Sequence, residues 1–312
     1  MNDLLLYSLA EFREIILPVL ELVDARSVVE IGGEGGTFTR ELAAWAEARG
    51  GAVRCIDPKP SNALVQLAEE SPAVEVLRCR SVEALDRMER SDVYLIDGDH
   101  NYWTLSHELR AIAGPSGGGD GDDGTAPVLF VHDVGWPAGR RDMYYDPAGL
   151  PPEGVHPHEY EEGVTVGCAS TVPHGFRGEG EFAWARHEGG PANGVLTAVE
   201  DFLAERPELD MRVVPCIFGL AVVFRRESPH AGALVELLDP YAGNPLLERL
   251  ERNRVALYLR VLEVESALVA TERALEDWTL RTRDVEVENR ALWARVAELE
   301  GRLGVLSARH EA

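Results

Sequence analysis

Lysine is almost absent from this chain of 312 residues. Lys59 is the only lysine, and the 30 basic residues stand against 54 acidic ones, for a formal net charge of −24. Such a field repels the phosphate backbone of nucleic acids, and no basic cluster exceeds two adjacent arginines, so we expect no nucleic-acid partner. The shortage of lysine also leaves no P-loop for nucleotide phosphates and argues against a pyridoxal Schiff base.

Cysteines and long apolar runs are scarce as well. The four cysteines are Cys55, Cys79, Cys168 and Cys216. They form no CxxC pair, which argues against a zinc site or redox motif, and we expect reduced thiols in a cytoplasmic protein. No run approaches the about 18 uncharged apolar residues that a membrane span needs. Charges such as Glu11 and Arg13 interrupt residues 1–26, which predict an amphipathic helix rather than a signal peptide.

The hydrophobic pattern predicts an α/β fold. From Ser27 onward, five short β-branched runs alternate with helix-length segments, at residues 28–31, 53–56, 74–77, 93–96 and 128–131. This alternation is typical of a doubly wound, mostly parallel sheet. Two later runs, 211–217 and 220–225, lie too close together for a crossover helix and predict an antiparallel hairpin at the sheet edge. We therefore expect a seven-stranded sheet in a domain of residues 27–230.

Three segments differ in composition from the predicted strands and helices. Residues 114–126 are almost all Gly, Asp, Ser and Pro, and predict a flexible surface loop. Residues 135–195 are rich in Gly, Pro, His and aromatic residues without periodicity, and such long segments more often form lids or substrate loops than idle connections. Residues 231–246 are expected to form a linker.

A heptad pattern runs from Leu247 to Leu306. Alternating steps of three and four residues pass 18 positions, of which 14 are apolar. Asn289 lies at an a position, which favours a parallel two-stranded register. We predict a long C-terminal coiled-coil helix over residues 247–306 that makes the protein a homo-oligomer, either a dimer or higher. The alternative is a helix that folds back on its own domain.

A glycine-rich turn follows the first predicted strand, between Val28 and Leu42. Glycines let the main chain approach a ligand closely, but the GxGxxG spacing of dinucleotide-binding folds is missing. Instead, Glu30 precedes the turn and Asp57 follows the second strand. A carboxylate after the second strand suits both ribose hydroxyls, and one near the turn suits an ammonium group rather than a pyrophosphate. The expected ligand is a cationic nucleoside without phosphate.

Four motifs carry a resemblance to a known family. They lie at residues 30–37, 55–58, 95–103 and 130–133, and read EIGGEGGT, CIDP, LIDGDHNYW and FVHD. They resemble the successive motifs of class I S-adenosylmethionine-dependent methyltransferases, most of all the cephalosporin-hydroxylase-like and macrocin O-methyltransferase-like subgroup. The resemblance covers roughly residues 25–225. It implies a Rossmann-like methyltransferase fold and S-adenosyl-L-methionine as the cofactor.

The resemblance also implies where this cofactor binds. The expected contacts are Glu30, Gly32, Gly33, Gly36, Thr37, Asp57, Ser81 and Asp97. Glu30 and the glycines would hold the amino-acid end, Asp57 the ribose, and Ser81 would lie beside the adenine. Glu34 departs from the family pattern, which often has glycine in that position.

Two aspartates end neighbouring strands and suggest a metal. Asp97 follows the fourth predicted strand and Asp133 the fifth, so both reach the carboxyl edge of the sheet. The matching positions hold magnesium in metal-dependent relatives, and two carboxylates plus waters suit octahedral Mg²⁺. His132 stands where a carboxylate or amide is commoner, and imidazole is a poor magnesium ligand. Without a metal, the two aspartates would orient a substrate hydroxyl and a histidine.

The expected catalytic residues are His100, His132 and Asp133. Methyl transfer to oxygen requires removal of a proton near neutral pH, for which histidine is suited. His100 is the first candidate base and His132 the second, and a structural role is an equal alternative for either. In the loop after the fifth strand, guanidinium and aromatic groups suit a sugar. These expected substrate residues are Arg140, Arg141, Tyr144 and Tyr145.

The sequence thus predicts an S-adenosylmethionine-dependent methyltransferase. Its small-molecule acceptor would offer a hydroxyl, or less often an amine, on a polar metabolite such as a sugar or a glycosylated natural product. Two alternatives stay open: a nucleoside-binding scaffold dimerised by its coiled coil, and an enzyme that uses the same cofactor for another reaction.

Overall fold

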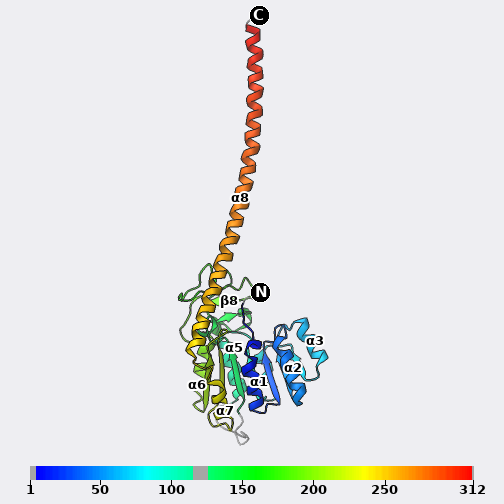
Figure 1. Ribbon diagram of the computed structural model, residues 1–312, viewed down its shortest axis with the longest axis vertical. Coiled ribbons are helices and arrows are strands. Elements are labelled where there is room, and N and C mark those ends of the chain that lie inside the picture. The colour runs from blue at the N-terminus through cyan, green and yellow to red at the C-terminus, as the bar shows by residue number, and fades with distance from the viewer. Residues whose placement is uncertain (1–4, 115–125, 311–312) are drawn as a thin grey trace. The chain divides into compact units, whose positions relative to one another are not determined.

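The computed structural model describes residues 5–114 and 126–310, with side chains up to residue 304 (Figure 1). Apart from its two end residues, the loop expected at 114–126 lies outside the described residues. The chain divides into two compact units, Met1–Leu259 and Arg260–Ala312.

The first unit is built on a seven-stranded sheet in the order β3-β2-β1-β4-β5-β10-β9. Its strands are β1 (Ser27–Ile31), β2 (Ala52–Ile56), β3 (Val74–Leu77), β4 (Val93–Ile96), β5 (Val128–His132), β9 (Leu209–Val214) and β10 (Leu220–Arg225). β1 pairs in parallel with β2 and β4, while β10 runs antiparallel between β5 and β9. The expected doubly wound, mostly parallel sheet with an antiparallel hairpin is confirmed.

Helices cover both faces of the sheet (Figure 1). They are η1 (Leu9–Phe12), α1 (Arg13–Leu22), α2 (Thr37–Arg49), α3 (Asn62–Glu70), α4 (Ser81–Ala84), α5 (Tyr102–Ala113), α6 (Val195–Ala204) and α7 (Ala231–Leu238). Adjacent residues of β1 point to opposite faces of the sheet and belong to separate hydrophobic cores. Val28 packs with residues of α1, α2 and α7, and Val29 packs with residues of α5 and α6. Because both faces are buried, the strands are continuous apolar runs in the sequence.

The N-terminal segment is amphipathic, as expected for residues 1–26. In the described part it forms the 3-10 helix η1 followed directly by α1, rather than one continuous α-helix. The buried side chains of α1 are Ile15, Ile16, Val19 and Leu20. Their spacing of three and four residues places them on one helical face, which packs into the core with α2 and α7.

Residues 135–195 contain a second, three-stranded sheet in the order β6-β8-β7. Its elements are β6 (Met143–Tyr144), β7 (His158–Glu159) and β8 (Ala183–Ala185), with the 3-10 helices η2 (Ala138–Arg140), η3 (Pro147–Gly149) and η4 (Pro152–Gly154). Trp184 on β8 is buried and contacts the rings of Phe176 and Phe182 edge to face. The segment therefore has an apolar centre of its own, and its role as a lid or substrate loop remains a prediction.

The expectation that residues 231–246 form a linker is wrong. The segment contains α7, whose Leu234 and Leu238 side chains are fully buried in the core formed with α1. Helix α8 (Pro245–His310) then begins, and its residues up to Leu259 belong to the first unit. The boundary between the two units consequently lies near residue 260 rather than at 247.

Helix α8 is 66 residues long, so the expected long C-terminal helix is confirmed. Beyond Leu259 its apolar side chains are exposed, for example Leu268, Leu275 and Leu292 at 57%, 60% and 63%. Pairing of this helix with a second copy remains a prediction. Among the described residues, no helix has the length and apolar character needed to cross a bilayer.

Candidate active site

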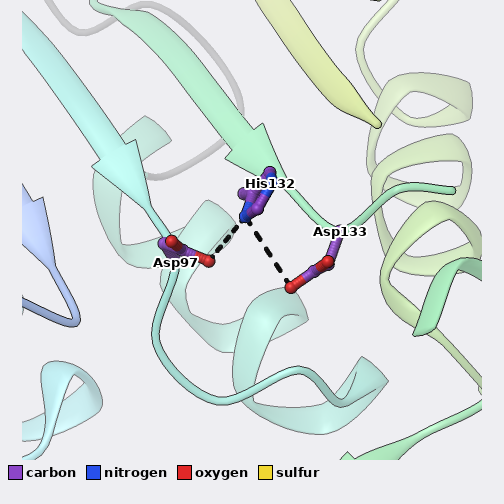
Figure 2. A group of neighbouring side chains, drawn as sticks. All are labelled: Asp97, His132 and Asp133. Atoms are coloured by element: carbon purple, nitrogen blue, oxygen red, sulfur yellow. Dashed lines mark hydrogen bonds and ion pairs between the residues drawn. The ribbon is translucent and has the colours of Figure 1, made fainter. Parts of the chain in front are cut away.

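The carboxyl ends of β4 and β5 bring three side chains together (Figure 2). Asp97 follows β4, His132 is the last residue of β5, and Asp133 comes next. His132 Nδ1 lies 2.9 Å from Asp97 Oδ1 and 3.7 Å from Asp133 Oδ2. Because β4 and β5 are adjacent parallel strands, their carboxyl ends meet at the edge where ligands bind in such sheets. The two aspartates are therefore neighbours, as their positions in the sequence indicated.

Asp133 also holds His100. Its backbone is left-handed, with φ 59°, a conformation that aspartate tolerates better than most residues. Asp133 Oδ2 lies 3.0 Å from Nδ1 of the buried His100 ring. Burial would lower the pKa of His100, but the charge of Asp133 and the hydrogen bond to it raise this pKa to about 8. An imidazole oriented by a carboxylate, with a pKa near neutrality, suits a general base.

His132 is buried and bonded at both ring nitrogens. Nδ1 faces Asp97, and Nε2 donates to the carbonyl oxygen of Ile217 over 2.8 Å. Burial would lower the pKa of His132, but the charges of Asp97 and Asp133 raise it to about 10. A ring that is charged at neutral pH and has both nitrogens engaged is a poor proton acceptor. The expectation that His132 is a second base is therefore not supported.

The same three residues have the arrangement of a cation site. One ligand atom from each of Asp97, His132 and Asp133 lies within 4.8 Å of the others. Since the Ile217 carbonyl takes the Nε2 proton, a neutral His132 would present the lone pair of Nδ1 to the two carboxylates. Sequence reasoning did not count His132 as a ligand, although its position before Asp133 in FVHD was the available signal.

The glycine turn between β1 and α2 passes against the end of β4. Gly32 has φ +87°, and a Cβ atom there would lie 2.1 Å from the carbonyl oxygen of Asp97, so only glycine fits. The amide of Glu34 donates to Asp57 Oδ2 over 3.1 Å. The hydrogen bond to Asp57 therefore links the glycine turn to the end of β2 and holds the main chain of the turn close to the Asp57 carboxylate.

A cavity of about 70 Å³ lies at this turn. It is lined by Tyr7, Ser8, Leu9, Glu30, Gly32, Gly33, Glu34, Gly35, Thr37, Phe38 and Asp97. Of the expected cofactor residues, Gly36, Asp57 and Ser81 are not among these lining residues. Ligand pockets usually measure ~300 Å³ or more, so this cavity has room for only one end of a cofactor-sized ligand.

A larger, open depression of about 590 Å³ lies beside β9 and the end of α7. It is lined by Met211, Arg212, Val213, Pro215, Asp239, Ala242, Gly243 and Glu248. None of the expected site residues is among them. We place the candidate site at the smaller cavity because it combines the glycine turn with a strand-end carboxylate at the edge of the sheet.

Glu30 supplies a buried carboxylate to the smaller cavity. It is 2% exposed, and its Oε2 accepts a hydrogen bond of 2.5 Å from the Thr39 hydroxyl. Burial raises the pKa of Glu30 to about 7, despite hydrogen bonds from Thr39 and Cys55. A cation placed in the cavity would favour the ionised carboxylate and be held by it. The surroundings of Glu30 thus favour an ammonium group over an anion.

Ser81 lies in a buried polar group that sequence reasoning missed. Its hydroxyl donates to Glu108, which sits on the apolar face of α5. Burial raises the pKa of Glu108 to about 8 and also raises the pKa of Asp99. Among the described residues, Glu108 Oε2 and Asp99 Oδ1 are buried without a hydrogen-bond partner. An acid between Leu105 and Leu109 of a helix was the signal that this position is unusual.

The expected substrate residues need correction. Arg141 is 1% exposed and donates to the carbonyl oxygens of Ala185 and Ala169, at 2.6 and 2.8 Å. Tyr144 is equally buried and donates its hydroxyl to Asp142. Neither side chain can reach a substrate, because both hold the 135–195 segment together.

The other two expected substrate residues behave differently from each other. Arg140 forms an exposed, bidentate ion pair with Glu200 on α6, away from the site. Tyr145 is 52% exposed, and its ring lies 6.0 Å from that of His100. Only Tyr145 of the four is placed where it can contact an acceptor beside the candidate base.

One protein-family model matches part of the chain. Residues 29–114, which run from β1 to α5, match the family model described as a methyltransferase domain. The resemblance to methyltransferases that the motifs indicated is confirmed for this segment. No curated protein gives a significant match to the chain.

Solved structures give a distant likeness. The S-adenosylhomocysteine-bound methyltransferase PaMTH1 of Podospora anserina is 13% identical, with a TM-score of 0.42, over 72% of this chain and 81% of that one. The O-methyltransferase TomG of Streptomyces achromogenes, involved in tomaymycin synthesis and solved with S-adenosylmethionine, is 17% identical, with a TM-score of 0.41, over 70% of this chain and 82% of that one. At such values the site must be interpreted from its own residues.

Replacing Arg141 with methionine should destabilise the fold rather than impair acceptor binding. The change leaves buried carbonyl oxygens without a hydrogen-bond donor. We therefore expect a loss of about 2–4 kcal/mol in the free energy of unfolding, measured with urea. Arg140→Met, which removes an exposed ion pair, is the matched control and should cost less than about 1 kcal/mol. Equal stability of the two variants would contradict the structural role of Arg141.

Proposed function

We propose that the protein is an S-adenosylmethionine-dependent methyltransferase that acts on a hydroxyl, in preference to an amine, of a small polar metabolite such as a sugar or a glycosylated natural product. One observation carries the proposal: the cavity at the glycine turn reaches Asp97, which shares its strand-end cluster with the His100–Asp133 pair. A cofactor site and a candidate base thus meet at one sheet edge. The methyltransferase-domain match over residues 29–114 supports the same function.

The electrostatics of the cavity support a cationic cofactor. Glu30 and Asp97 line it, and the charges of Asp97 and Asp57 both act to raise the pKa of Glu30. A phosphate would add a further negative charge, whereas an ammonium and a sulfonium relieve the repulsion. We assign the amino-acid end of the cofactor to this cavity and the ribose to Asp57, whose oxygens keep lone pairs beyond the two amide bonds they accept.

The chain's own residues would prepare the acceptor. When bound, S-adenosylmethionine supplies an electrophilic methyl group on sulfur. Asp133 fixes Nδ1 of His100, so the other ring nitrogen, Nε2, takes the proton as the acceptor oxygen bonds to carbon. Tyr145, beside His100, offers an aromatic face to the acceptor, and residues 135–195 would form its binding loop. Alignment of the two reactants would contribute further to the acceleration.

Asp97, His132 and Asp133 fit a divalent cation that would stabilise the developing alkoxide. Two carboxylates and one imidazole suit Mn²⁺ or Zn²⁺ better than the Mg²⁺ expected from sequence, because imidazole is a poor magnesium ligand. The Ile217 carbonyl supports this assignment, since metal-bound histidines usually donate their second ring N–H to such a group.

Binding of the product analogue tests the cofactor site. Calorimetry should show S-adenosylhomocysteine binding to the wild type and a roughly ten- to hundredfold weaker affinity for Asp57→Asn, which loses charged hydrogen-bond acceptance. Asp86→Asn, at an exposed position, is the control and should bind as the wild type does. Absence of binding to the wild type would refute the proposed function. Binding without turnover on any acceptor would favour a nucleoside-binding scaffold. A product other than a methylated acceptor would favour an enzyme that uses the cofactor for another reaction.

Metal binding is tested separately with Mn²⁺ alone, followed by electron paramagnetic resonance. We expect binding that Asp97→Asn weakens more than about tenfold and Asp86→Asn leaves unchanged. Affinity should rise with pH from about 6 toward the His132 pKa of about 10, because the proton on His132 Nδ1 must leave before the metal binds. If Asp97→Asn binds Mn²⁺ like the wild type, these residues are not the metal site.

We further propose that the tail pairs with a second copy of the chain. Where α8 lies against its own unit it uses Glu251, Val255 and Tyr258, while Leu250 and Leu257 of the heptad stripe stay 55% and 59% exposed. In the first turns of α8 the unit therefore covers Leu247 and Arg254 only in part and leaves Leu250 and Leu257 exposed. Two such stripes bury each other in a coiled coil.

Substitution within the stripe tests this pairing in the full-length protein. Sedimentation equilibrium should give a dimer or higher oligomer for the wild type and a shift toward monomer for Leu275→Lys, with dissociation strengthened more than roughly tenfold. Leu280→Lys makes the same change at an equally exposed position outside the stripe and should stay oligomeric. A monomeric wild type, or equal effects of the two variants, would contradict the coiled coil.

A further inference from the structure

The turn between β9 and β10 is unusual in its backbone. Ile217, Phe218 and Gly219 have φ values of 50°, 63° and 86°, three left-handed residues in a row. Glycine adopts this region freely, but a β-branched residue such as isoleucine is strained there. Such a conformation persists only where surrounding contacts stabilise it. The hydrogen bonds of this turn therefore show which groups hold it in place.

All four backbone polar groups of Ile217 and Phe218 are bonded. The carbonyl of Ile217 accepts from His132 Nε2 over 2.8 Å, and that of Phe218 accepts from the amide of Gly135 over 2.5 Å. The two amides donate to the carboxylate of Glu251 on α8, each over 3.0 Å. Successive amides of this kind form a concave anion site. Glu251 fills that site and thereby fixes the carbonyl that holds His132.

Arg254, one turn further along α8, joins Glu251 to a second part of the site. Its guanidinium donates to both Glu251 oxygens over 2.6 and 2.7 Å and lies 4.5 Å from the centre of the Phe218 ring. Its Nη1 also donates to the carbonyl of Leu6 over 3.0 Å. The next residues, 7–9, line the cavity at the glycine turn.

We propose that Glu251 and Arg254 are positioning residues for the active site. Glu251 sets the orientation of His132 through the 217–219 turn, and Arg254 anchors the N-terminal segment that covers the glycine-turn cavity. The kinetic consequences rest on the proposed methyltransferase function, whereas the orientation of His132 does not. Both residues lie in the part of α8 that belongs to the first unit.

The charges of the pair are suited to this role. Burial opposes ionisation of Glu251, but the hydrogen bonds from Arg254 and from the Phe218 amide hold the pKa of Glu251 below its usual range. An ionised carboxylate accepts both amides at once, whereas an amide side chain has one acceptor and would point its NH₂ group at the other N–H. Glu251→Gln therefore breaks one contact of the turn with almost no change in volume.

Nitrogen NMR of the histidine side chains in the full-length protein tests the orientation of His132. We expect Glu251→Gln to shift the His132 Nε2 resonance, and Glu251→Asp, which keeps both acceptors, to restore it in part. Glu248→Gln, exposed on the same helix, is the control and should match the wild type. An unchanged His132 resonance in a folded Glu251→Gln variant would overturn the positioning role of Glu251.

Ligand binding and kinetics test the consequences for the site. Glu251→Gln should lower kcat roughly ten- to hundredfold with little change in KM for the cofactor, because a small displacement at the reacting groups is costly. Arg254→Met should weaken S-adenosylhomocysteine binding about fivefold or more, and Arg252→Met, an exposed neighbour, should not. Equal affinity of these two variants would overturn the role of Arg254. If the wild type binds no S-adenosylhomocysteine, the proposed function fails, and the NMR result still decides the inference.

Discussion

The structure depends on the burial of His132 between Asp97 and a backbone carbonyl. Removing charged groups from water costs several kcal/mol per ion, which only close partners and complete hydrogen bonding can offset. Two carboxylates, Asp97 and Asp133, meet two imidazoles, His132 and His100, so the cluster is close to neutral when both rings are protonated. Asp133 has a left-handed backbone, and its Oδ2 lies 3.0 Å from His100 Nδ1 and 3.7 Å from His132 Nδ1, so one carboxylate faces both rings.

The same constraint explains why the neighbouring cavity favours a cation. The Asp97 side chain serves both places: it pairs with His132 and lines the cavity that holds Glu30. Protonated His132 offsets part of the strand-end negative charge, but Thr39 and Cys55 offer Glu30 only neutral hydrogen bonds. A positively charged ligand would offset the negative charge that remains at this point. In the whole chain, 54 acidic residues outnumber 30 basic ones, so carboxylates exceed the cationic side chains available to balance them.

The sequence predicted the sheet and the strand-end residues because their signal is local. A strand buried on both faces is a continuous apolar run, and the polar residue that ends it must lie at the sheet edge. Arg141 and Tyr144 were misassigned because burial of a loop residue depends on contacts with distant segments, and a buried arginine has the same sequence context as an exposed one. Glu251 could not be linked to His132 for the same reason, since its connection runs through backbone groups of the 217–219 turn.

The first turns of α8 show why a heptad pattern alone placed the boundary at residue 247. A helix can carry two faces at once, and here Val255 is 4% exposed while Leu250 and Leu257 are more than half exposed. The face that includes Glu251 and Val255 belongs to the first unit, whereas the heptad pattern of the stripe continues through these turns. Arg254, a charged residue within that stripe, marks the overlap: an arginine is poorly suited to a coiled-coil seam but well suited to bridging Glu251 and the N-terminal segment. Arg254 interrupts the apolar heptad stripe because its side chain contacts Glu251 and the N-terminal segment instead.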